Sequence, residues 1–167
     1  QHEFRYAFVA PKGKYLVNAD YSGQESIILV NNSLDKDLLE FYDHGGGDLH
    51  SFVAQKIWPE LQSLTLAEVK EQYKDKRQIA KSANFALAYG GNGYTIATNL
   101  GISAAEGDKV YEDYFKAFPG LKSYFESVVN KSLKQEYILI DKVTRRKFFF
   151  PYIKEMYACE HRGNFKR

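Results

Sequence analysis

The strongest constraint on the fold is a helical pattern that runs from Thr65 to about Tyr89. Thr65 and Glu68, three residues apart, resemble a capping box, in which two side chains satisfy backbone N–H groups at the start of a helix. The Gly-Gly-Asn-Gly run at residues 90–93 ends the pattern, because glycine costs helical order and favours turns. We therefore expect one long helix here, within a helix-rich protein.

Shorter stretches on both sides also have helical character. Asp48 is a good N-cap for one of them and Pro59 stops it, while Pro119 leads another. The expected helices cover approximately residues 25–30, 35–42, 48–58, 65–89, 103–118 and 119–135. Four rings near residue 115 share one helical face, and we expect them in the core rather than in a ligand site. They are Tyr111, Tyr114, Phe115 and Phe118.

Two regions are β-prone instead. Residues 14–20 are mostly apolar and follow Pro11-Lys12-Gly13, which predicts a turn feeding a buried strand that ends at Asp20. Residues 137–140 and 147–150 predict a hairpin, and the tail after Pro151 is ambiguous. The expected fold class is α+β and helix-rich, without repeats or a linker that would mark a second independent domain.

Composition excludes several classes of protein. The 167 residues, 44% of them hydrophobic and 26% charged, fit one globular domain. The net charge of +2 is too small for a strongly basic nucleic-acid binder, so any anion site must be local. A single cysteine, Cys159, rules out an internal disulfide, and no zinc ligand set is visible. No apolar run is long enough to cross a membrane, so we expect an intracellular, cytoplasmic protein without a membrane partner, an organelle remaining open.

Four residues spaced four apart lie on the long helical pattern. This stripe consists of Arg77, Lys81, Phe85 and Tyr89. At about 100° and 1.5 Å per residue, it covers roughly 120° of one helix face and about 18 Å of its length. Two cations at one end would hold phosphates, and two rings at the other would meet a sugar and a base. The alternative, a solvated cationic face with both rings in the core, is not excluded by spacing alone.

Asp20, at the end of the expected strand, offers a second kind of chemistry. Mg²⁺ prefers carboxylate and carbonyl oxygens on a rigid support, which a strand end provides. An aspartate at this position also serves as a helix cap or a surface charge. Taken alone, Asp20 does not decide between these uses.

Three ordered motifs together resemble motifs A and B of family A, DNA polymerase I-like, DNA polymerases. They are Asp20-Tyr21-Ser22-x-x-Glu25, Asp48-Leu49-His50 and Arg77-x3-Lys81-x3-Phe85-x3-Tyr89-Gly90. The likeness extends from residues 7–11 through residues 114–119 to residues 145–151, so it covers most of the chain. Gly23 departs from the Gln of many bacterial members and resembles phage-type branches, which leaves a viral origin open.

The resemblance implies a two-metal nucleotidyl transfer from a dNTP to a primer 3′-OH. Asp20 would bind both catalytic Mg²⁺ ions, and the backbone carbonyl of Tyr21 would help to hold one. Lys81 would act in catalysis and, with Arg77, would contact the incoming triphosphate. Two interpretations fit His50 equally well: it contacts a phosphate, or it is a residue in the first turn of a helix whose hydrogen bonds are already satisfied.

The resemblance also implies roles at the sugar and base. Phe85 would lie against both, Tyr89 would stack near the templating position, and Glu25 would block the space that a ribose 2′-OH needs. Residues 1–34 would be a palm segment with motif A, residues 35–136 the helical fingers with motif B, and residues 137–167 a hairpin returning towards the palm. The expected partners are primer-template DNA, dNTPs and the remainder of the polymerase.

One part of the family pattern does not occur. The second metal-binding aspartate of the family lies in a later His-Asp-Glu motif, and this triplet is absent from the sequence. Two-metal catalysis needs a carboxylate cluster around both ions. We therefore expect a truncated polymerase domain that does not extend a primer by itself.

Two alternatives remain open. A single-subunit RNA polymerase also uses an Asp strand and a Lys-x7-Tyr-Gly helix, but Glu25 would obstruct a ribose and Phe85 stands where those enzymes usually carry Met. A nucleotide- or DNA-binding module that has lost catalysis would explain the missing carboxylate, although it would have no need of Asp20. Arg145, Arg146 and Lys147 fit either a backbone contact to nucleic acid or a solvated hairpin.

Overall fold

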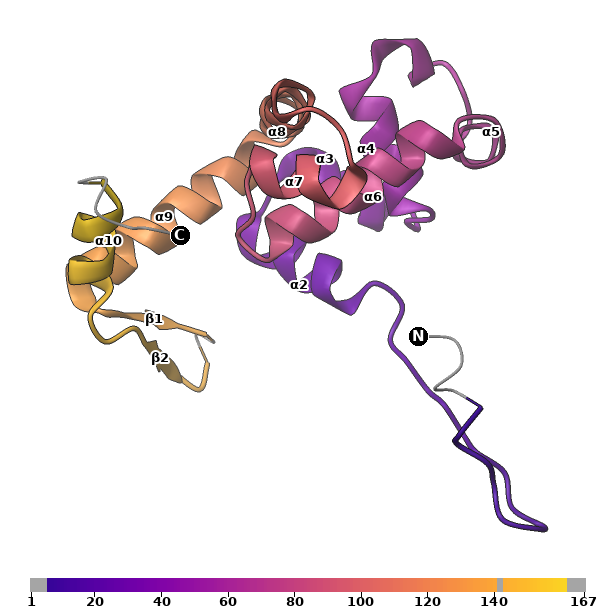
Figure 1. The fold of residues 1–167 in the computed structure, drawn as a ribbon, viewed down its shortest axis with the longest axis horizontal. Helices are drawn as coiled ribbons and strands as arrows, with labels where there is room; N and C mark the ends of the chain where they lie inside the picture. The colour runs from indigo at the N-terminus through magenta and orange to yellow at the C-terminus, as the bar shows by residue number, and fades with distance from the viewer. Residues whose placement is uncertain (1–5, 141–142, 162–167) are drawn as a thin grey trace.

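The computed structural model describes residues 6–140 and 143–161. Within these ranges it has nine α-helices, one 3₁₀ helix and one two-stranded sheet (Figure 1). The helices are α2 (Gln24–Ser33), α3 (Lys36–Asp43), α4 (Leu49–Ile57), η1 (Pro59–Leu61), α5 (Leu66–Gln72), α6 (Lys74–Ala88), α7 (Gly93–Leu100), α8 (Ala104–Ala117), α9 (Pro119–Gln135) and α10 (Ile153–His161). The helix-rich fold predicted from the sequence is confirmed, and α10 resolves the ambiguous tail.

The long helix expected from Thr65 to Tyr89 is two helices. The Thr65–Glu68 capping box is present at the start of α5, but the chain breaks at Tyr73, with φ −121° and ψ 50°, before α6 begins. Both helices contact α4. A straight helix over this run would be about 35 Å long, whereas α4 is about 13 Å, so both halves can pack on α4 only if the chain bends.

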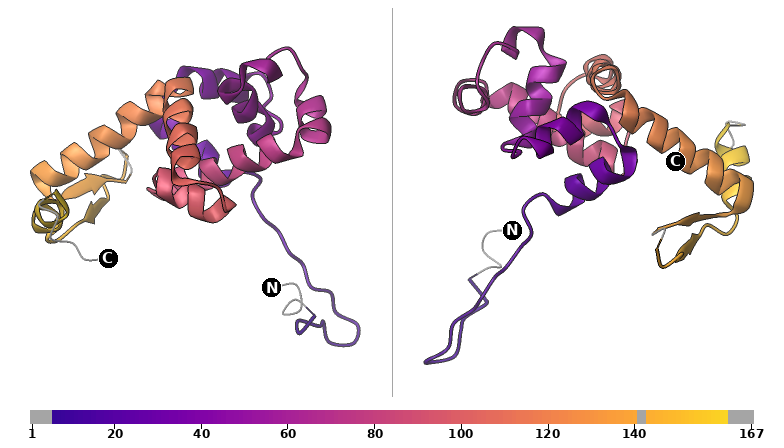
Figure 2. Two further views of the ribbon diagram at one scale, coloured as in Figure 1. Left: turned by 45° about the horizontal axis from the view of Figure 1, so that its top comes forward. Right: turned by 180° about the vertical axis from the view of Figure 1, so that it is seen from behind.

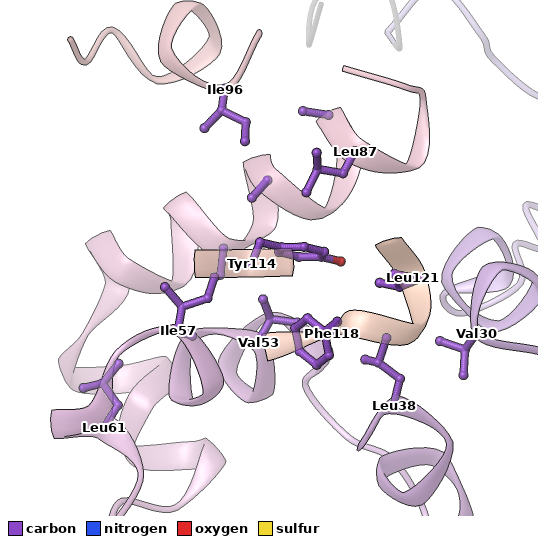
Figure 3. Packing of buried hydrophobic residues seen from close by; sticks show 14 of the residues in the cluster. Val30, Leu38, Val53, Ile57, Leu61, Leu87, Ile96, Tyr114, Phe118 and Leu121 are labelled. Carbon is purple, nitrogen blue, oxygen red and sulfur yellow. The ribbon is translucent and has the colours of Figure 1, made fainter. Parts of the chain in front are cut away.

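The core lies where α4, α6, α8 and the start of α9 meet (Figure 3). The short side chains of Ala80 and Ala83 on α6 are fully buried, as are Val53 and Ala54 on α4. Among the four rings expected in the core, Tyr114 and Phe118 are buried and Tyr111 and Phe115 pack against the cluster. That prediction is confirmed.

Helix α7, which the sequence pattern did not predict, packs closely on α8. A Cβ added to Gly107 of α8 would lie 2.3 Å from the carbonyl oxygen of Gly93 and 2.7 Å from the Cβ of Ala97. Only glycine permits this approach. Gly93 belongs to the run predicted to end the preceding helix, and it also begins α7, because Asn92 caps this helix and forms a capping box with Thr95.

A buried carboxylate ties the start of α9 to α3. Asp35 is the N-cap of α3 and accepts from the backbone N–H of Leu38 at 3.4 Å. Its other oxygen accepts from the backbone N–H of Gly120 at 2.8 Å. The tie holds α9, which also contacts α2, against the helical body.

The strand expected at residues 14–20 does not form. The turn before it is present, with the Lys14 N–H donating to the Pro11 carbonyl at 2.9 Å, but the chain then runs as an extended arm away from the helices (Figures 1 and 2). Tyr15 and Val17 are exposed rather than buried. A strand needs a hydrogen-bonded neighbour, and no segment in the described ranges pairs with this one.

The predicted hairpin is confirmed at the far end of α9 (Figure 1). Strand β1 (Tyr137–Leu139) pairs antiparallel with β2 (Lys147–Phe149), with Ile138 opposite Phe148. Residues 141 and 142 of the expected connection lie outside the described part. None of the described helices is both long and apolar enough to cross a membrane.

Candidate functional site

The stripe expected on the long helix lies on α6 and its C-cap. Arg77, Lys81 and Phe85 belong to α6, and Tyr89 is its C-cap. The alanine-rich face of the helix is buried, so the stripe faces outward. Phe85 is 44% exposed and Tyr89 is 73% exposed. The alternative that placed both rings in the core is therefore wrong, and both can contact a ligand.

A bidentate ion pair holds the cationic end of the stripe. Nε and Nη2 of Arg77 donate to the two carboxylate oxygens of Asp48 at 2.6 and 2.8 Å. Asp48 also accepts from the hydroxyl of Ser51. Asp48 stands at the expected N-cap position of α4, but its side chain makes no capping bond because it is directed to Arg77 and Ser51. The pair joins the start of α4 to the first half of α6.

The charge of this pair is fixed over the physiological pH range. Burial alone would raise the pKa of the Asp48 carboxyl, but hydrogen bonds from Arg77 and Ser51 and the nearby positive charge lower that pKa to about 2. The hydrogen bond to Asp48 in turn raises the pKa of Arg77. Asp48 is therefore an anion that orients Arg77, and it leaves three of the five guanidinium N–H groups for other acceptors.

His50, on the first turn of α4, lies beside the middle of the stripe. Its ring centroid is 5.9 Å from that of Phe85. Nδ1 of His50 lies 3.0 Å from Nδ2 of Asn84, and the hydroxyl of Tyr114 donates to Oδ1 of Asn84 at 2.8 Å. One ring nitrogen is thus held by α6. A first-turn contact within α4 does not account for the position of His50.

Burial lowers the pKa of His50. The carboxylate of Asp48 acts in the opposite direction, and the positive charges of Arg77 and Lys81 lower the pKa further. The imidazole is therefore neutral at pH 7, although it lies within the electrostatic influence of two permanent cations.

Glu25 meets the aromatic end of the stripe. The hydroxyl of Tyr89 donates to a carboxylate oxygen of Glu25, on the first turn of α2, at 2.7 Å. This hydrogen bond, followed by the charge of Glu25, raises the pKa of Tyr89. Both side chains border an open groove of about 370 Å³ with an apolar wall that includes Leu29, Ala88 and Phe125. The fold thus brings together residues from motif A and motif B that are 64 positions apart.

Asp20 and Tyr21 stand apart from this arrangement. Both lie on the exposed arm just before α2, and no hydrogen bond or ion pair joins either of them to the stripe in the described residues. A carboxylate and an adjacent carbonyl are suitable donors for Mg²⁺, but two donors are fewer than its octahedral coordination needs. The described ranges contain no group of three or more acidic, His or Cys side chains that could hold a metal. These residues alone do not form a metal site.

A family model for DNA polymerase family A matches residues 1–167, the whole chain. The chain belongs to DNA polymerase family A. This membership favours the DNA polymerase resemblance over the single-subunit RNA polymerase alternative.

The similar proteins agree with this family. DNA polymerase I of Lactococcus lactis subsp. lactis is 30% identical over 145 residues, which is 87% of this chain and 16% of that protein. DNA polymerase I of Helicobacter pylori is 35% identical over 131 residues, covering 78% of this chain and 14% of that protein. The chain therefore spans about one sixth of the length of these relatives.

A solved structure supports the fold. The POL domain of Pol1 from M. smegmatis, in complex with DNA primer-template and dNTP, aligns with a TM-score of 0.67 and 33% identity. The alignment covers 81% of this chain and 22% of that one. The mostly helical architecture thus matches part of the POL domain of Pol1.

Sequence reasoning missed two residues of the site. Asn84 and Tyr114 were not assigned to it, although Asn84 is a polar residue on the otherwise apolar, buried face of α6. A buried amide among alanines requires hydrogen-bond partners, and this was the available signal. Tyr114 gave none, because its position on a helical face predicts core packing alone.

Proposed function

We propose that this chain forms the part of a DNA polymerase that binds the incoming dNTP for template-directed transfer to a primer 3′-OH. The observation that carries the proposal is the stripe on α6, with two cations followed by two exposed rings on the face opposite the buried alanines. Family membership supports it. The M. smegmatis neighbour, which contains primer-template and dNTP, supports the same assignment.

The triphosphate would bind at the cationic end. Arg77, oriented by Asp48, and Lys81, one helical turn further along α6, both supply charge-assisted hydrogen bonds, which are the strong ones for phosphate oxygens. Lys81 would neutralise charge on the phosphate being transferred and so act in catalysis. His50, whose ring lies beside Phe85, would add a neutral donor.

The sugar and base would lie at the aromatic end. Phe85 would lie against the sugar and Tyr89 near the templating base, because exposed rings stack on nucleotides. Glu25, held by the hydroxyl of Tyr89, would occupy the volume that a 2′-OH needs. A fixed carboxylate rejects a ribonucleotide by clash, which an apolar pocket cannot do.

The remaining assignments follow the family. Residues 1–34 would belong to the palm, residues 35–136 to the fingers, and residues 137–167 to a hairpin that returns towards the palm. Asp20 and Tyr21 would contribute two oxygen donors to the Mg²⁺ ions of the complete polymerase, where Mg²⁺ stabilises charge on the transferring phosphate. The other donors would come from other parts of the polymerase. With this partial donor set, we expect the chain alone not to extend a primer.

Nucleotide binding by the 167-residue chain tests the proposal. Isothermal titration calorimetry with dTTP should show Lys81→Ala binding about tenfold or more weakly, since a charge-assisted hydrogen bond contributes about 1.5–3 kcal/mol. Lys109→Ala removes the same charge from an exposed position on α8 and should leave binding unchanged. Equal affinities for wild type and Lys81→Ala would contradict the proposal.

A further inference from the structure

A chain of two hydrogen bonds crosses the core behind the stripe. It runs from the hydroxyl of Tyr114 on α8 to the amide of Asn84 on α6, and from that amide to Nδ1 of His50 on α4. Tyr114 is 3% exposed and Asn84 is 9% exposed, so water does not compete for the bond between them, and the bond to His50 is partly buried. Tyr114 and Asn84 are 30 positions apart in the sequence, and Asn84 and His50 are 34 positions apart. Only the packing of the helices brings them together.

The buried hydroxyl of Tyr114 determines which groups donate and which accept in these two hydrogen bonds. Burial, followed by the charge of Asp35 and the phenol of Tyr42, raises the pKa of Tyr114, so its hydroxyl keeps its hydrogen. A buried O–H needs an acceptor, and Oδ1 of Asn84, at 2.8 Å, provides it. This orientation turns the NH₂ group of Asn84 to His50. An NH₂ group only donates, so Nδ1 of His50 must accept with its lone pair.

We propose that Asn84 and Tyr114 are positioning residues that hold His50 in the tautomer protonated on Nε2, so that His50 offers the triphosphate a neutral N–H donor. The proposal rests on the proposed function for what His50 binds. The opposite tautomer would present a lone pair to phosphate oxygens, and lone pairs repel. The tautomer therefore decides whether His50 attracts or repels the nucleotide.

Burial and the charges of Arg77 and Lys81 also favour a neutral His50, and the carboxylate of Asp48, which raises the pKa of His50, offsets them only in part. Protonation of Nδ1 would set an N–H against the NH₂ group of Asn84. Arg77 and Lys81 both lie on α6, and Asp48 on α4 is already paired with Arg77. His50 thus stays neutral without losing its donor.

The tautomer is measurable without any nucleotide. In two-bond ¹H–¹⁵N spectra of the 167-residue chain labelled with ¹⁵N-histidine, we expect an unprotonated Nδ1 and a protonated Nε2 for His50. His50→Gln assigns the signal among the four histidines. Tyr114→Phe frees the amide of Asn84 to rotate and should give a mixture of tautomers. Tyr111→Phe, on the same helix but outside the chain of hydrogen bonds, should not. A protonated Nδ1 in the wild type, or an unchanged spectrum in Tyr114→Phe, overturns the proposal.

Asn84→Asp reverses the direction of the hydrogen bond to His50, because it replaces the NH₂ donor with a carboxylate acceptor. The carboxylate accepts from Nδ1–H, so it raises the pKa of His50 and selects the opposite tautomer in the neutral ring. Binding of dTTP should then weaken roughly tenfold as pH rises through that raised pKa, because Nε2 loses its hydrogen. The wild type should show no such step. The double variant Asn84→Asp, His50→Gln corrects for titration of dTTP itself.

The two proposals fail in different ways. If the wild type does not bind dTTP at any pH, the proposed function fails, while the nucleotide-free spectra still decide the tautomer. If the wild type binds and the pH profile of Asn84→Asp parallels that of its double variant, the positioning role fails and nucleotide binding stands.

Discussion

The helical body and the N-terminal arm differ in how they hold their functional residues. In the body, Arg77 is fixed by Asp48 and His50 by Asn84, all on helices that share one core. On the arm, Asp20 is exposed and has no neighbour strand among the described residues. The surface proposed to bind phosphate is therefore held in place by contacts within the described residues, whereas the carboxylate proposed to bind metal has no packed neighbour among them.

Stability should differ most sharply between these two regions. Leu61 lies in the body and is 0% exposed. Leu61→Ala should lower the free energy of unfolding by about 2–5 kcal/mol, because it removes buried apolar surface and leaves a cavity without contacts. Val17 lies on the arm and is 90% exposed. Val17→Ala should lower the free energy of unfolding by less than about 0.5 kcal/mol. Urea unfolding of both variants measures the difference. Equal losses would mean that the arm packs on the body in solution.

The Asp48–Arg77 pair tests the rigidity of the cationic end. Asp48→Asn should lower stability at pH 7 by about 1–3 kcal/mol, since it removes charge from two hydrogen bonds. Because the folded-state pKa of Asp48 is lowered from 3.8 to about 2, the contribution is complete above pH 3.8 and is lost as pH falls through about 2. The Asp48→Asn variant should not show this loss of stability at low pH.

A matched control is the exposed pair between Lys116 and Asp113 on α8. Asp113→Asn should change stability by less than about 0.5 kcal/mol, because solvent screens an exposed pair. Thermal or urea unfolding between pH 2 and pH 7 compares the two variants. The same acid profile in Asp48→Asn and wild type would show that Asp48 is not paired in solution.

The contact of Glu25 with Tyr89 joins the helix after the arm to the body, and it should matter for selectivity more than for stability. Glu25→Ala should reduce the preference of the chain for dATP over ATP by up to about tenfold, because it opens the volume beside the 2′ position. Its effect on stability should stay within about 0.5 kcal/mol, as both side chains are on the surface. Glu112→Ala, an exposed change on α8, is the control. An unchanged nucleotide preference in folded Glu25→Ala would remove its steric role.

Much of the fold could be predicted because its signals are local. The capping box at Thr65 and the turn before Lys14 need only neighbouring residues, and both are present. The predictions were wrong where contacts between distant segments determine the local structure. Tyr73 breaks a helix that the pattern continues, because α5 and α6 must both reach α4. The arm lacks its strand because strand pairing is not a local property.

The candidate site shows the same division. Motif spacing placed Arg77, Lys81, Phe85 and Tyr89 on one face, and the structure places them there. Spacing did not indicate that Asp48 would orient Arg77 or that Asn84 would reach His50. Those contacts join residues 29 and 34 positions apart, and they depend on how α4 crosses α6.

The sequence by itself determined the family, most helix positions and the residue types of the stripe, because periodicity, capping and motif order are written in neighbouring residues. The tertiary structure alone decided which side chains hold one another. It paired Asp48 with Arg77, Glu25 with Tyr89 and Asn84 with both Tyr114 and His50. The physical reason is that the packing of the helices determines which polar side chains lie within reach of one another, and that a buried polar group such as the amide of Asn84 must find a partner among them.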